Sequence, residues 1–407
     1  MPEPIAKRQL IFAWPYVEWG GAQIYMMAIM KLARTDWDVL VLLPLDSMSE
    51  MVQHLDDLGV GYELIDTHTD MRPAPTLRRK LQRQMRRVRD LRMIYRRLVE
   101  FDLANSILHI EVAPWQDWIF LTMLSMRRAN VFVTMHNFPR SPSRLRSMIW
   151  WLRFQLVSRL PRFHIFASNL DTRKKLKGWV SDPFHKRIHV TYTCIDPDQI
   201  EAAVRHPVDV SQERRRHDIP ADDVVVLCVG QFIDRKGRWI FLESAKQICE
   251  TRDDVSFVWV APRRGTDDET ARIESYGLGS RFRLLLSEEI GGRSEVLRFF
   301  RIADVFALPS LVEGLPIALL EAMALGLPVV STDTDAIPEA VMDRKTGILV
   351  PPGDAGRLAK AILELIDNPD LRASLAAAGR KFVLEHFDER VASAIALETY
   401  RECFSNG

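Results

Sequence analysis

The 407-residue sequence is poor in cysteine, because it has only four cysteines and none of them lies in a CxxC pair. This scarcity excludes a disulfide-stapled scaffold, offers no zinc-ligand spacing and favours a reducing compartment. Long hydrophobic runs are missing too, since no apolar stretch reaches the roughly 18 residues that a spanning helix needs. The apolar run at residues 10–14 is too short for the core of a signal peptide. We therefore expect a cytoplasmic protein.

An excess of one charge is also lacking, since 55 Lys and Arg residues offset 54 Asp and Glu residues for a net charge of +1. This balance hides two unequal halves of the chain. Residues 1–205 have 30 basic and 21 acidic side chains, whereas residues 206–407 have 25 and 33. A basic half is typical of a chain that meets a polyanion or a membrane surface. The composition itself, 47% apolar and 27% charged, is that of a globular protein.

Short apolar runs, each followed by a longer helical pattern, recur along the chain. They lie at residues 9–13, 38–43, 106–110, 130–134, 164–167, 224–229, 255–260, 281–286, 304–308 and 328–331. Such runs predict parallel strands buried on both faces, and the strand–helix alternation predicts a doubly wound α/β sheet. The series occurs twice, with a polar, proline-punctuated stretch between the two copies. We predict two Rossmann-like domains, residues 1–205 and 206–389, with the ligand at the carboxyl ends of their strands.

Two features of the first half follow predicted strands. Gly20 and Gly21 open an apolar-periodic helix, where glycine admits a close ligand and the helix N-terminus favours an anion such as a diphosphate. His136 lies just past another strand and can donate a hydrogen bond to a sugar hydroxyl or a phosphate. The alternatives are a plain strand-to-helix turn, since GxGxxG is absent here, and a loop histidine without a role.

In the second half, a basic pair between glycines follows the apolar strand at residues 224–229. Arg235 and Lys236 precede Gly237 at the start of a predicted helix, which is a suitable place for a phosphate clamp. The pattern GxxxxGK[ST] is absent, so this is no Walker loop. The alternative is a solvated basic turn.

The most specific motif reads EGLPIALLE, from Glu313 to Glu321. Glu313 is predicted in a loop after a strand, a helix begins near Pro316, and Glu321 falls in its second turn. Both carboxylates can therefore face a ligand at the helix N-terminus, where the N–H groups of Gly314 and Leu315 favour an anion. An acidic side chain on ribose hydroxyls is typical of nucleotide sites. The alternative is a solvated helix with a chance pair of glutamates.

At this motif the sequence resembles the retaining glycosyltransferases of family 4, the glycosyl transferases group 1. The resemblance covers nearly the whole chain and is densest at residues 224–353. It implies the GT-B architecture, in which two Rossmann-like domains face a central cleft. It also implies that a C-terminal helix, residues 390–407, crosses back to the N-terminal domain. The implied activity is transfer of a sugar, with retention, from a nucleotide-sugar donor to a glycan or lipid-linked acceptor in cell-surface glycan or glycolipid synthesis, with no metal and no cofactor.

The resemblance also assigns roles to residues. Glu313 matches the glutamate on the transferred sugar, Glu321 the glutamate on the nucleotide ribose, and Lys236 the phosphate-binding lysine. The backbone of Gly314, Leu315 and Pro316 matches the stretch that runs along the sugar and the diphosphate. Gly20 and Gly21 match the loop near the diphosphate. His136 matches the histidine near the primary hydroxyl of the sugar. Gln231 departs from the family, which often has arginine there, and we expect Arg235 to supply that charge.

Two basic segments lie in the N-terminal half. Residues 78–97 hold ten Lys and Arg against one acidic residue, with apolar residues every three or four positions, and residues 143–163 mix arginines with Trp150, Trp151 and Phe154. Such segments suit the surface of an anionic membrane, here the inner leaflet of the cytoplasmic membrane. The alternative is a solvated helix with core-packed tryptophans. We expect no nucleic-acid partner, because no nucleic-acid motif accompanies the charge.

The sequence is less consistent with other classes of protein. A phosphorylase of related architecture needs a far longer chain and a lysine for pyridoxal phosphate, and a sugar-nucleotide epimerase is not expected to carry Glu-x7-Glu. A catalytically silent GT-B scaffold or binding subunit is the remaining alternative. The intact Glu313, Glu321 and Lys236 argue against it.

Overall fold

The computed structural model describes residues 7–14, 20–67, 76–138 and 143–405. The chain divides into two compact units, each described here by itself: unit 1 is Met1–Thr191 with Arg390–Gly407, and unit 2 is Tyr192–Glu389. The helix α8 (Pro197–Arg205), which lies before the boundary expected from the sequence, groups with unit 2. It does so because it contacts α12 (Arg293–Phe299) of that unit.

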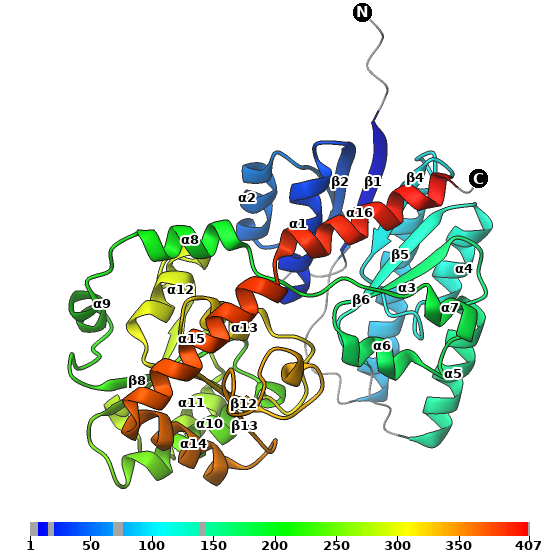
Figure 1. The fold of residues 1–407 in the computed structure, drawn as a ribbon. Helices are drawn as coiled ribbons and strands as arrows, with labels where there is room; N and C mark the ends of the chain where they lie inside the picture. Colours follow the sequence, from blue (N-terminus) through cyan, green and yellow to red (C-terminus); the bar gives the residue numbers. More distant parts are fainter. Residues whose placement is uncertain (1–6, 15–19, 68–75, 139–142, 406–407) are drawn as a thin grey trace, which may run out of the picture. The chain divides into compact units, whose positions relative to one another are not determined.

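Unit 1 is built on a seven-stranded parallel sheet in the order β3-β2-β1-β4-β5-β6-β7 (Figure 1). The strands are β1 (Arg8–Ala13), β2 (Trp37–Pro44), β3 (Gly61–Ile65), β4 (Ser106–Ile110), β5 (Asn130–Met135), β6 (Phe163–Ala167) and β7 (His189–Val190). The order reverses between β1 and β4, which confirms the predicted doubly wound sheet. The prediction missed β3 and β7, because β3 is a partly exposed edge strand and β7 has two residues.

Helices cover both faces of this sheet. They are α1 (Gly21–Ala33), α2 (Ser49–Leu58), α3 (Leu77–Leu98), α4 (Trp118–Met126), α5 (Arg144–Val157), α6 (Leu170–Leu176), α7 (Asp182–Lys186) and α16 (Glu389–Ser405). The C-terminal helix α16 packs in unit 1, since Ala396, Leu397 and Tyr400 share a buried core cluster with α1 (Figure 1). The predicted return of the C-terminal helix to the N-terminal domain is thereby confirmed.

Unit 2 has a six-stranded parallel sheet in the order β10-β9-β8-β11-β12-β13. Its strands are β8 (Val224–Val229), β9 (Val255–Ala261), β10 (Phe282–Leu286), β11 (Val305–Leu308), β12 (Val329–Thr332) and β13 (Ile348–Val350). Besides α8 and α12, its helices are α9 (Val210–Arg216), α10 (Arg238–Cys249), α11 (Asp267–Glu274), α13 (Ile317–Ala324), α14 (Ala355–Asp367) and α15 (Pro369–His386). The short turns η1 (Asp234–Lys236), η2 (Gly279–Arg281), η3 (Phe300–Ile302) and η4 (Ile337–Glu339) complete it. This sheet also reverses beside its first strand, so both predicted Rossmann-like sheets are present.

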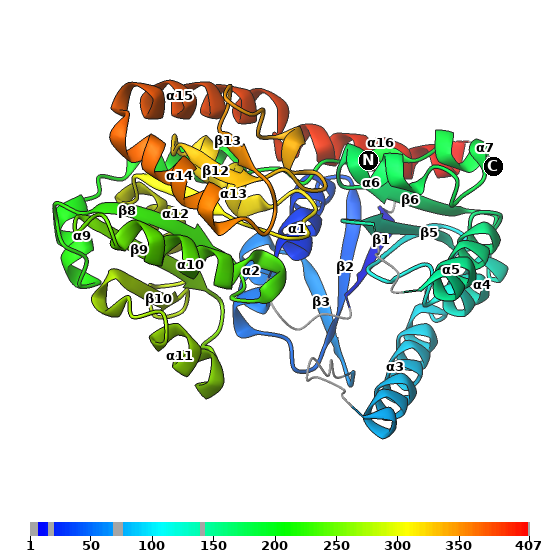
Figure 2. The same cartoon turned by 90° about the horizontal axis from the view of Figure 1, so that it is seen from below.

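The basic helix α3 packs along only part of its length. Its C-terminal half buries Ile94 and Leu98 in the core of unit 1, whereas Leu77, Leu81 and Met85 are 82%, 61% and 65% exposed. Figure 2 shows this N-terminal half extending beyond α4 and α5. The apolar residues that recur every three or four positions in this helix therefore pack only near its C-terminal end.

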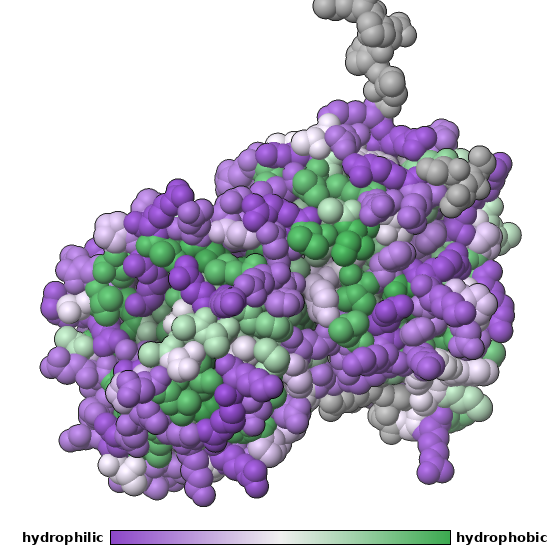
Figure 3. All heavy atoms as spheres, viewed as in Figure 1, coloured by the Kyte–Doolittle hydropathy of each residue, from purple (hydrophilic) through white to green (hydrophobic). Residues whose placement is uncertain are grey.

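The face of the molecule shown in Figure 3 is mostly hydrophilic. Purple side chains dominate the face seen in Figure 3, and apolar side chains show between them in smaller patches. Within the described residues, no helix is both long enough and apolar enough to cross a membrane.

A buried polar chain ties α16 to the sheet of unit 1. His109 is fully buried on β4, its Nδ1 lies 2.5 Å from the hydroxyl of Tyr400, and its Nε2 lies 2.8 Å from Oγ1 of Thr134. Burial disfavours the imidazolium and lowers the pKa of His109 to about 3, with a smaller contribution from His136. In the neutral ring one nitrogen donates and the other accepts, so the imidazole can form hydrogen bonds with both hydroxyls.

This buried histidine makes the stability of the protein depend on pH. Below about pH 6.5 the unfolded chain binds a proton at His109, whereas the folded chain does not until the pH is near 3. The free energy of unfolding should therefore fall as the pH drops through this window, by up to about 1.4 kcal/mol per pH unit. Urea titrations of wild type and His109→Gln between pH 7 and 4.5 measure the difference in slope. The exposed His206→Gln is the control, and a wild-type slope equal to that of His109→Gln would contradict the expectation.

Candidate active site

Three predicted residues of unit 2 meet at the carboxyl ends of β8 and β11. Lys236 lies in η1 after β8, and Glu313 lies in the loop after β11. Nζ of Lys236 is 2.5 Å from Oε2 of Glu313, and Nη1 of Arg235 is 3.2 Å from Oε1. The hydroxyl of Ser310 also donates to this carboxylate, at 3.2 Å. Both positive charges of the predicted phosphate clamp thus surround a single carboxylate.

The surroundings of Glu313 keep it ionised. Its side chain is 9% exposed, and burial by itself raises the pKa of a carboxyl group. The charges of Lys236 and Arg235 outweigh burial, so the pKa of Glu313 lies below its ordinary value. This site therefore holds two cations and one anion in a poorly hydrated position, where electrostatic interactions are strong.

A close backbone approach fixes the two segments that carry these charges. Gly237 has φ of +77°, and a Cβ built there would lie 1.9 Å from the carbonyl oxygen of Pro309. The N–H of Leu311 donates to the carbonyl of Arg235 at 2.8 Å. Glycine is required at position 237 both by its left-handed backbone and by the neighbouring chain.

The second glutamate of the motif is paired elsewhere. Glu321 lies in the second turn of α13, is 2% exposed, and forms an ion pair with Arg293 at the start of α12. A second bond runs from Nη1 of Arg293 to Oε2 of Glu321, at 3.2 Å. A ligand that binds Glu321 must therefore displace or share Arg293.

The remaining donor-side predictions lie along the same loops. Gly314 and Leu315 are buried between Glu313 and α13, and Pro316 is the N-cap residue of that helix. Gln231 follows β8, and its carbonyl accepts a hydrogen bond from the N–H of Ile233 at 2.9 Å. These residues lie in the loops that precede η1 and α13.

The predicted residues of the first half belong to unit 1. His136 follows β5, its side chain is 27% exposed, and its ring packs edge-on against Tyr25. Gly20 is the N-cap residue of α1, and Gly21 begins the helix. Gly20 has an extended backbone with φ of −170°, so its conformation is open to any residue.

Sequence reasoning missed four residues of these sites. Arg293 pairs with Glu321, Asp335 accepts from the N–H of Glu313 at 3.0 Å, Ser310 binds the Glu313 side chain, and Glu111 lies 3.5 Å from His136. Only Arg293 had a local signal, because a basic residue in the first turn of a helix opposes the helix dipole and indicates an anionic partner.

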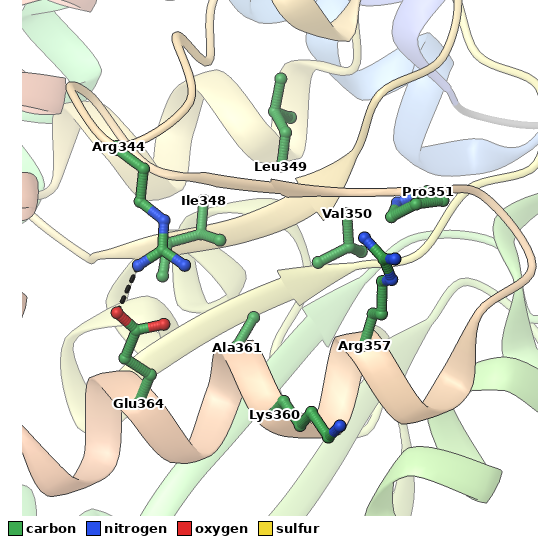
Figure 4. A pocket seen from close by; sticks show the side chains of 9 residues that line it. All are labelled: Arg344, Ile348, Leu349, Val350, Pro351, Arg357, Lys360, Ala361 and Glu364. Carbon is green, nitrogen blue, oxygen red and sulfur yellow. Dashed lines mark hydrogen bonds and ion pairs between the residues drawn. The ribbon is translucent and has the colours of Figure 1, made fainter.

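Two further observations bear on ligands. Among the described residues, no group of three or more His, Cys, Asp or Glu side chains is placed to hold a metal ion. A hollow of about 370 Å³ lies between β13 and α14, and Arg344 and Glu364 form an ion pair at one end of it (Figure 4). None of the predicted site residues lines this hollow.

Comparison with known proteins places the chain in a family. Residues 209–382 match the family described as Glycosyl transferases group 1. Over 283 residues, 66% of this chain, the sequence is 34% identical to the phosphatidyl-myo-inositol mannosyltransferase of Mycobacterium leprae, of which 73% is covered. The chain belongs to this family. It is a glycosyltransferase of family 4 that uses a nucleotide sugar, and the epimerase and phosphorylase interpretations fall away.

Other members of glycosyl transferases group 1 match more partially. The GDP-mannose-dependent monoacylated alpha-(1-6)-phosphatidylinositol monomannoside mannosyltransferase of Corynebacterium glutamicum is 29% identical over 184 residues. That match covers 44% of this chain and 47% of the relative, so the chain spans about half of its length. Among solved structures, HepE of Anabaena in complex with UDP-glucose has a TM-score of 0.77 and 18% identity, covering 97% of this chain and 100% of the other. This likeness shows the GT-B fold.

Proposed function

We propose that this glycosyltransferase moves a hexose, with retention at the anomeric carbon, from a nucleotide-sugar donor bound by unit 2 to a lipid-linked or glycan acceptor. The observation that carries the proposal is the placement of Lys236 and Arg235 around the buried carboxylate of Glu313, at the carboxyl ends of β8 and β11. The acceptor class follows the names of the relatives, which act on phosphatidylinositol species.

In the proposed mechanism, donor binding changes the groups with which Lys236 and Arg235 form ion pairs. As donor enters, Lys236 and Arg235 leave the carboxylate of Glu313 and bind the diphosphate, which gains negative charge as the bond from the anomeric carbon to the phosphate oxygen breaks. Glu313 is then free to accept hydrogen bonds from hydroxyls of the transferred sugar. The acceptor oxygen bonds to the anomeric carbon on the face that the diphosphate leaves, and its proton passes to the departing phosphate oxygen.

A similar exchange is proposed for the nucleotide. Glu321 leaves Arg293 and accepts from the ribose hydroxyls, and Arg293 turns to the donor or to solvent. No metal ion has a part in this scheme, because basic side chains and the N-terminus of α13 neutralise the leaving group. No separate cofactor is required either.

A panel of donors tests the proposal. Thermal unfolding with UDP-, GDP- and ADP-sugars, including UDP-glucose and GDP-mannose, should identify one donor that stabilises the protein. At 100 times its dissociation constant a ligand contributes about 2.7 kcal/mol. NMR of the product should then show the anomeric configuration of the donor. An inverted product would reject retention, and the absence of both binding and turnover with every donor would reject the function.

We further propose that unit 1 docks on the anionic inner leaflet of the cytoplasmic membrane, where a lipid-linked acceptor is met. The exposed stripe of α3, Leu77, Leu81, Met85 and Val88, recurs every three or four residues between basic side chains. The helix α5 of the same unit, which contacts α4 as α3 does, also has exposed apolar side chains, which are Leu145, Met148, Ile149, Trp151, Leu152 and Leu156. Apolar residues rimmed by cations are typical of helices at the lipid interface.

The charge available to lipid is smaller than the sequence suggests. Three arginines of α3 form ion pairs within unit 1, namely Arg87 with Asp117, Arg89 with Asp66 and Arg97 with Glu63. All three belong to the C-terminal two-thirds of the helix. The N-terminal turns, which carry the exposed stripe, are therefore the part that we expect to meet the membrane.

Vesicle co-sedimentation measures this binding. Wild type should bind vesicles that contain phosphatidylglycerol at low salt and be released at high salt, because the attraction is screened. Leu81→Asp should reduce the bound fraction by about tenfold, since it removes an apolar contact and adds a repelled charge. Val391→Asp on α16, at 62% exposure, is the matched control. Equal binding of the two variants, or no wild-type binding at low salt, would reject the proposal.

A further inference from the structure

Two buried polar atoms of unit 1 lie near each other without a hydrogen-bond partner. They are Oε1 of Glu111 and Nε2 of His136, which are 3.5 Å apart. Glu111 is 5% exposed, so water does not freely reach its carboxylate. A buried carboxylate oxygen without a donor is costly, so it needs an explanation, and a ligand that supplies the missing bond is one.

The strand period places both residues on the same face of the sheet. Along β4, Ile107 and His109 point into the core shared with α1 and α16, and Glu111 is the next residue on that face. Along the neighbouring β5, Thr134 lies on this face and His136 follows it. Both side chains therefore stand at the carboxyl ends of adjacent strands.

Their position in the sheet is the one where ligands bind. The strand order reverses between β1 and β4, and Glu111 follows β4 directly. In open α/β sheets the crevice at such a reversal is the usual ligand site. The pair thus lies at the binding edge of unit 1, whereas Lys236 and Glu313 belong to unit 2.

The histidine of this pair is held rigidly. The Nδ2 of Asn169 donates to the carbonyl of His136 at 2.9 Å, and the ring of Tyr25 meets the imidazole edge-on with centroids 5.3 Å apart. The hydroxyl of Tyr25 is itself fixed at 2.5 Å from Oγ1 of Thr191. A preorganised donor and acceptor cost a ligand little ordering when it binds.

The family resemblance already implies a sugar hydroxyl beside His136. We infer that Glu111 binds the same hydroxyl group of a sugar or polyol, with Glu111 accepting the hydroxyl hydrogen while Nε2–H of His136 donates to the hydroxyl oxygen. A hydroxyl is both donor and acceptor, so a single group satisfies both buried atoms. A phosphate is repelled by the carboxylate, and an ammonium leaves the histidine donor unpaired. Glu111 is thus a residue that binds the sugar substrate directly, and the inference rests on the proposed transfer of a sugar.

The variant Glu111→Leu separates this role from a structural one. Replacing an unpaired buried carboxylate by an apolar group removes a desolvation cost, so the full-length variant should unfold at or above the wild-type temperature. Binding or KM for the sugar that uses the pair should worsen at least tenfold, the usual range for a hydrogen bond to a charged group. Glu111→Gln, which keeps an acceptor, should recover part of the loss. Glu100→Gln, at an exposed carboxylate of unit 1, is the matched control.

Binding measurements with different ligands identify whether the donor or the acceptor carries this hydroxyl. Titrations of UDP-glucose and GDP-mannose are compared with those of UDP and GDP, and saturation-transfer NMR follows free myo-inositol and D-mannose. Weaker binding of the nucleotide sugar with unchanged binding of its nucleoside diphosphate assigns the hydroxyl to the donor sugar. A lost signal from myo-inositol or D-mannose, with donor binding unchanged, assigns it to the acceptor.

Two results would overturn the inference. The first is that Glu111→Leu binds its ligands and turns over within twofold of wild type, in which case only water occupies the space beside Glu111 and His136. The other is a clear loss of stability in both Glu111 variants, which would assign the carboxylate a structural role. Wild type that binds no nucleotide sugar would instead reject the proposed function, so the two failures are distinguishable.

Discussion

Lys236→Ala and Glu313→Gln are each expected to lower the rate of sugar transfer by about 10²–10³-fold, the usual effect of removing one group aimed at charge that develops in the transition state. Lys236 lies 2.5 Å from Glu313, so the two residues exchange partners when donor binds. The loss should appear mainly in kcat for Lys236→Ala, because the diphosphate gains charge as the bond breaks. Steady-state release of nucleoside diphosphate with acceptor present measures the rate.

The effect of the Lys236 and Glu313 variants on protein stability must be distinguished from their effect on catalysis. Glu313→Gln leaves the charges of Lys236 and Arg235 uncompensated and should cost up to about 3 kcal/mol of unfolding free energy, whereas Lys236→Ala leaves Glu313 paired with Arg235 and should cost less. The double variant Lys236→Met with Glu313→Gln removes the closer ion pair as a whole and should recover most of the stability lost in Glu313→Gln while remaining inactive. Transfer near the wild-type rate in either single variant would reject the site, and activity of the double variant would do so as well.

Gly237→Ala is expected to destabilise unit 2 by about 2–4 kcal/mol, from a left-handed backbone that alanine disfavours and from overpacking. The new Cβ would lie 1.9 Å from the carbonyl oxygen of Pro309, so the Lys236 turn must separate from the loop that carries Glu313. Activity should fall with stability, since these segments hold the two charges in place. Denaturant unfolding measures the first effect and turnover the second.

Gly277→Ala is the matched control for this prediction. Gly277 lies in the same unit, has φ of +70° and has open space where a Cβ would go. It therefore isolates the backbone cost, expected at about 1 kcal/mol. If Gly237→Ala and Gly277→Ala lower the free energy of unfolding equally, the close approach to Pro309 does not contribute to stability and Gly237 does not fix the two loops.

Most of the fold could be predicted because its strands are buried on both faces. Such strands appear as continuous apolar runs, and every predicted run of this kind is a strand in the structure. The missed strands β3, β7 and β13 are edge or very short strands without such a run. The length of α3 was also predictable from its pattern, but the lack of a packing partner for Leu77 and Leu81 depends on tertiary structure.

The candidate site was only partly predictable, for a related reason. Glu313, Lys236 and Glu321 stand in local motifs, whereas their partners Arg293 and Asp335 come from other loops and have no fixed spacing. The ion pair of Arg235 with Glu313 was not predicted either. Such ion pairs depend on contacts between segments that are distant in the sequence, so sequence motifs do not reveal them.

The most direct test of the central claim is calorimetric titration of the nucleoside diphosphate of the preferred donor into wild type and Lys236→Ala. The claim is that the cations held on Glu313 are the groups that receive the diphosphate. We predict that affinity falls at least tenfold in Lys236→Ala, since a hydrogen bond to a charged group is lost. Equal affinity in the two proteins would contradict the claim.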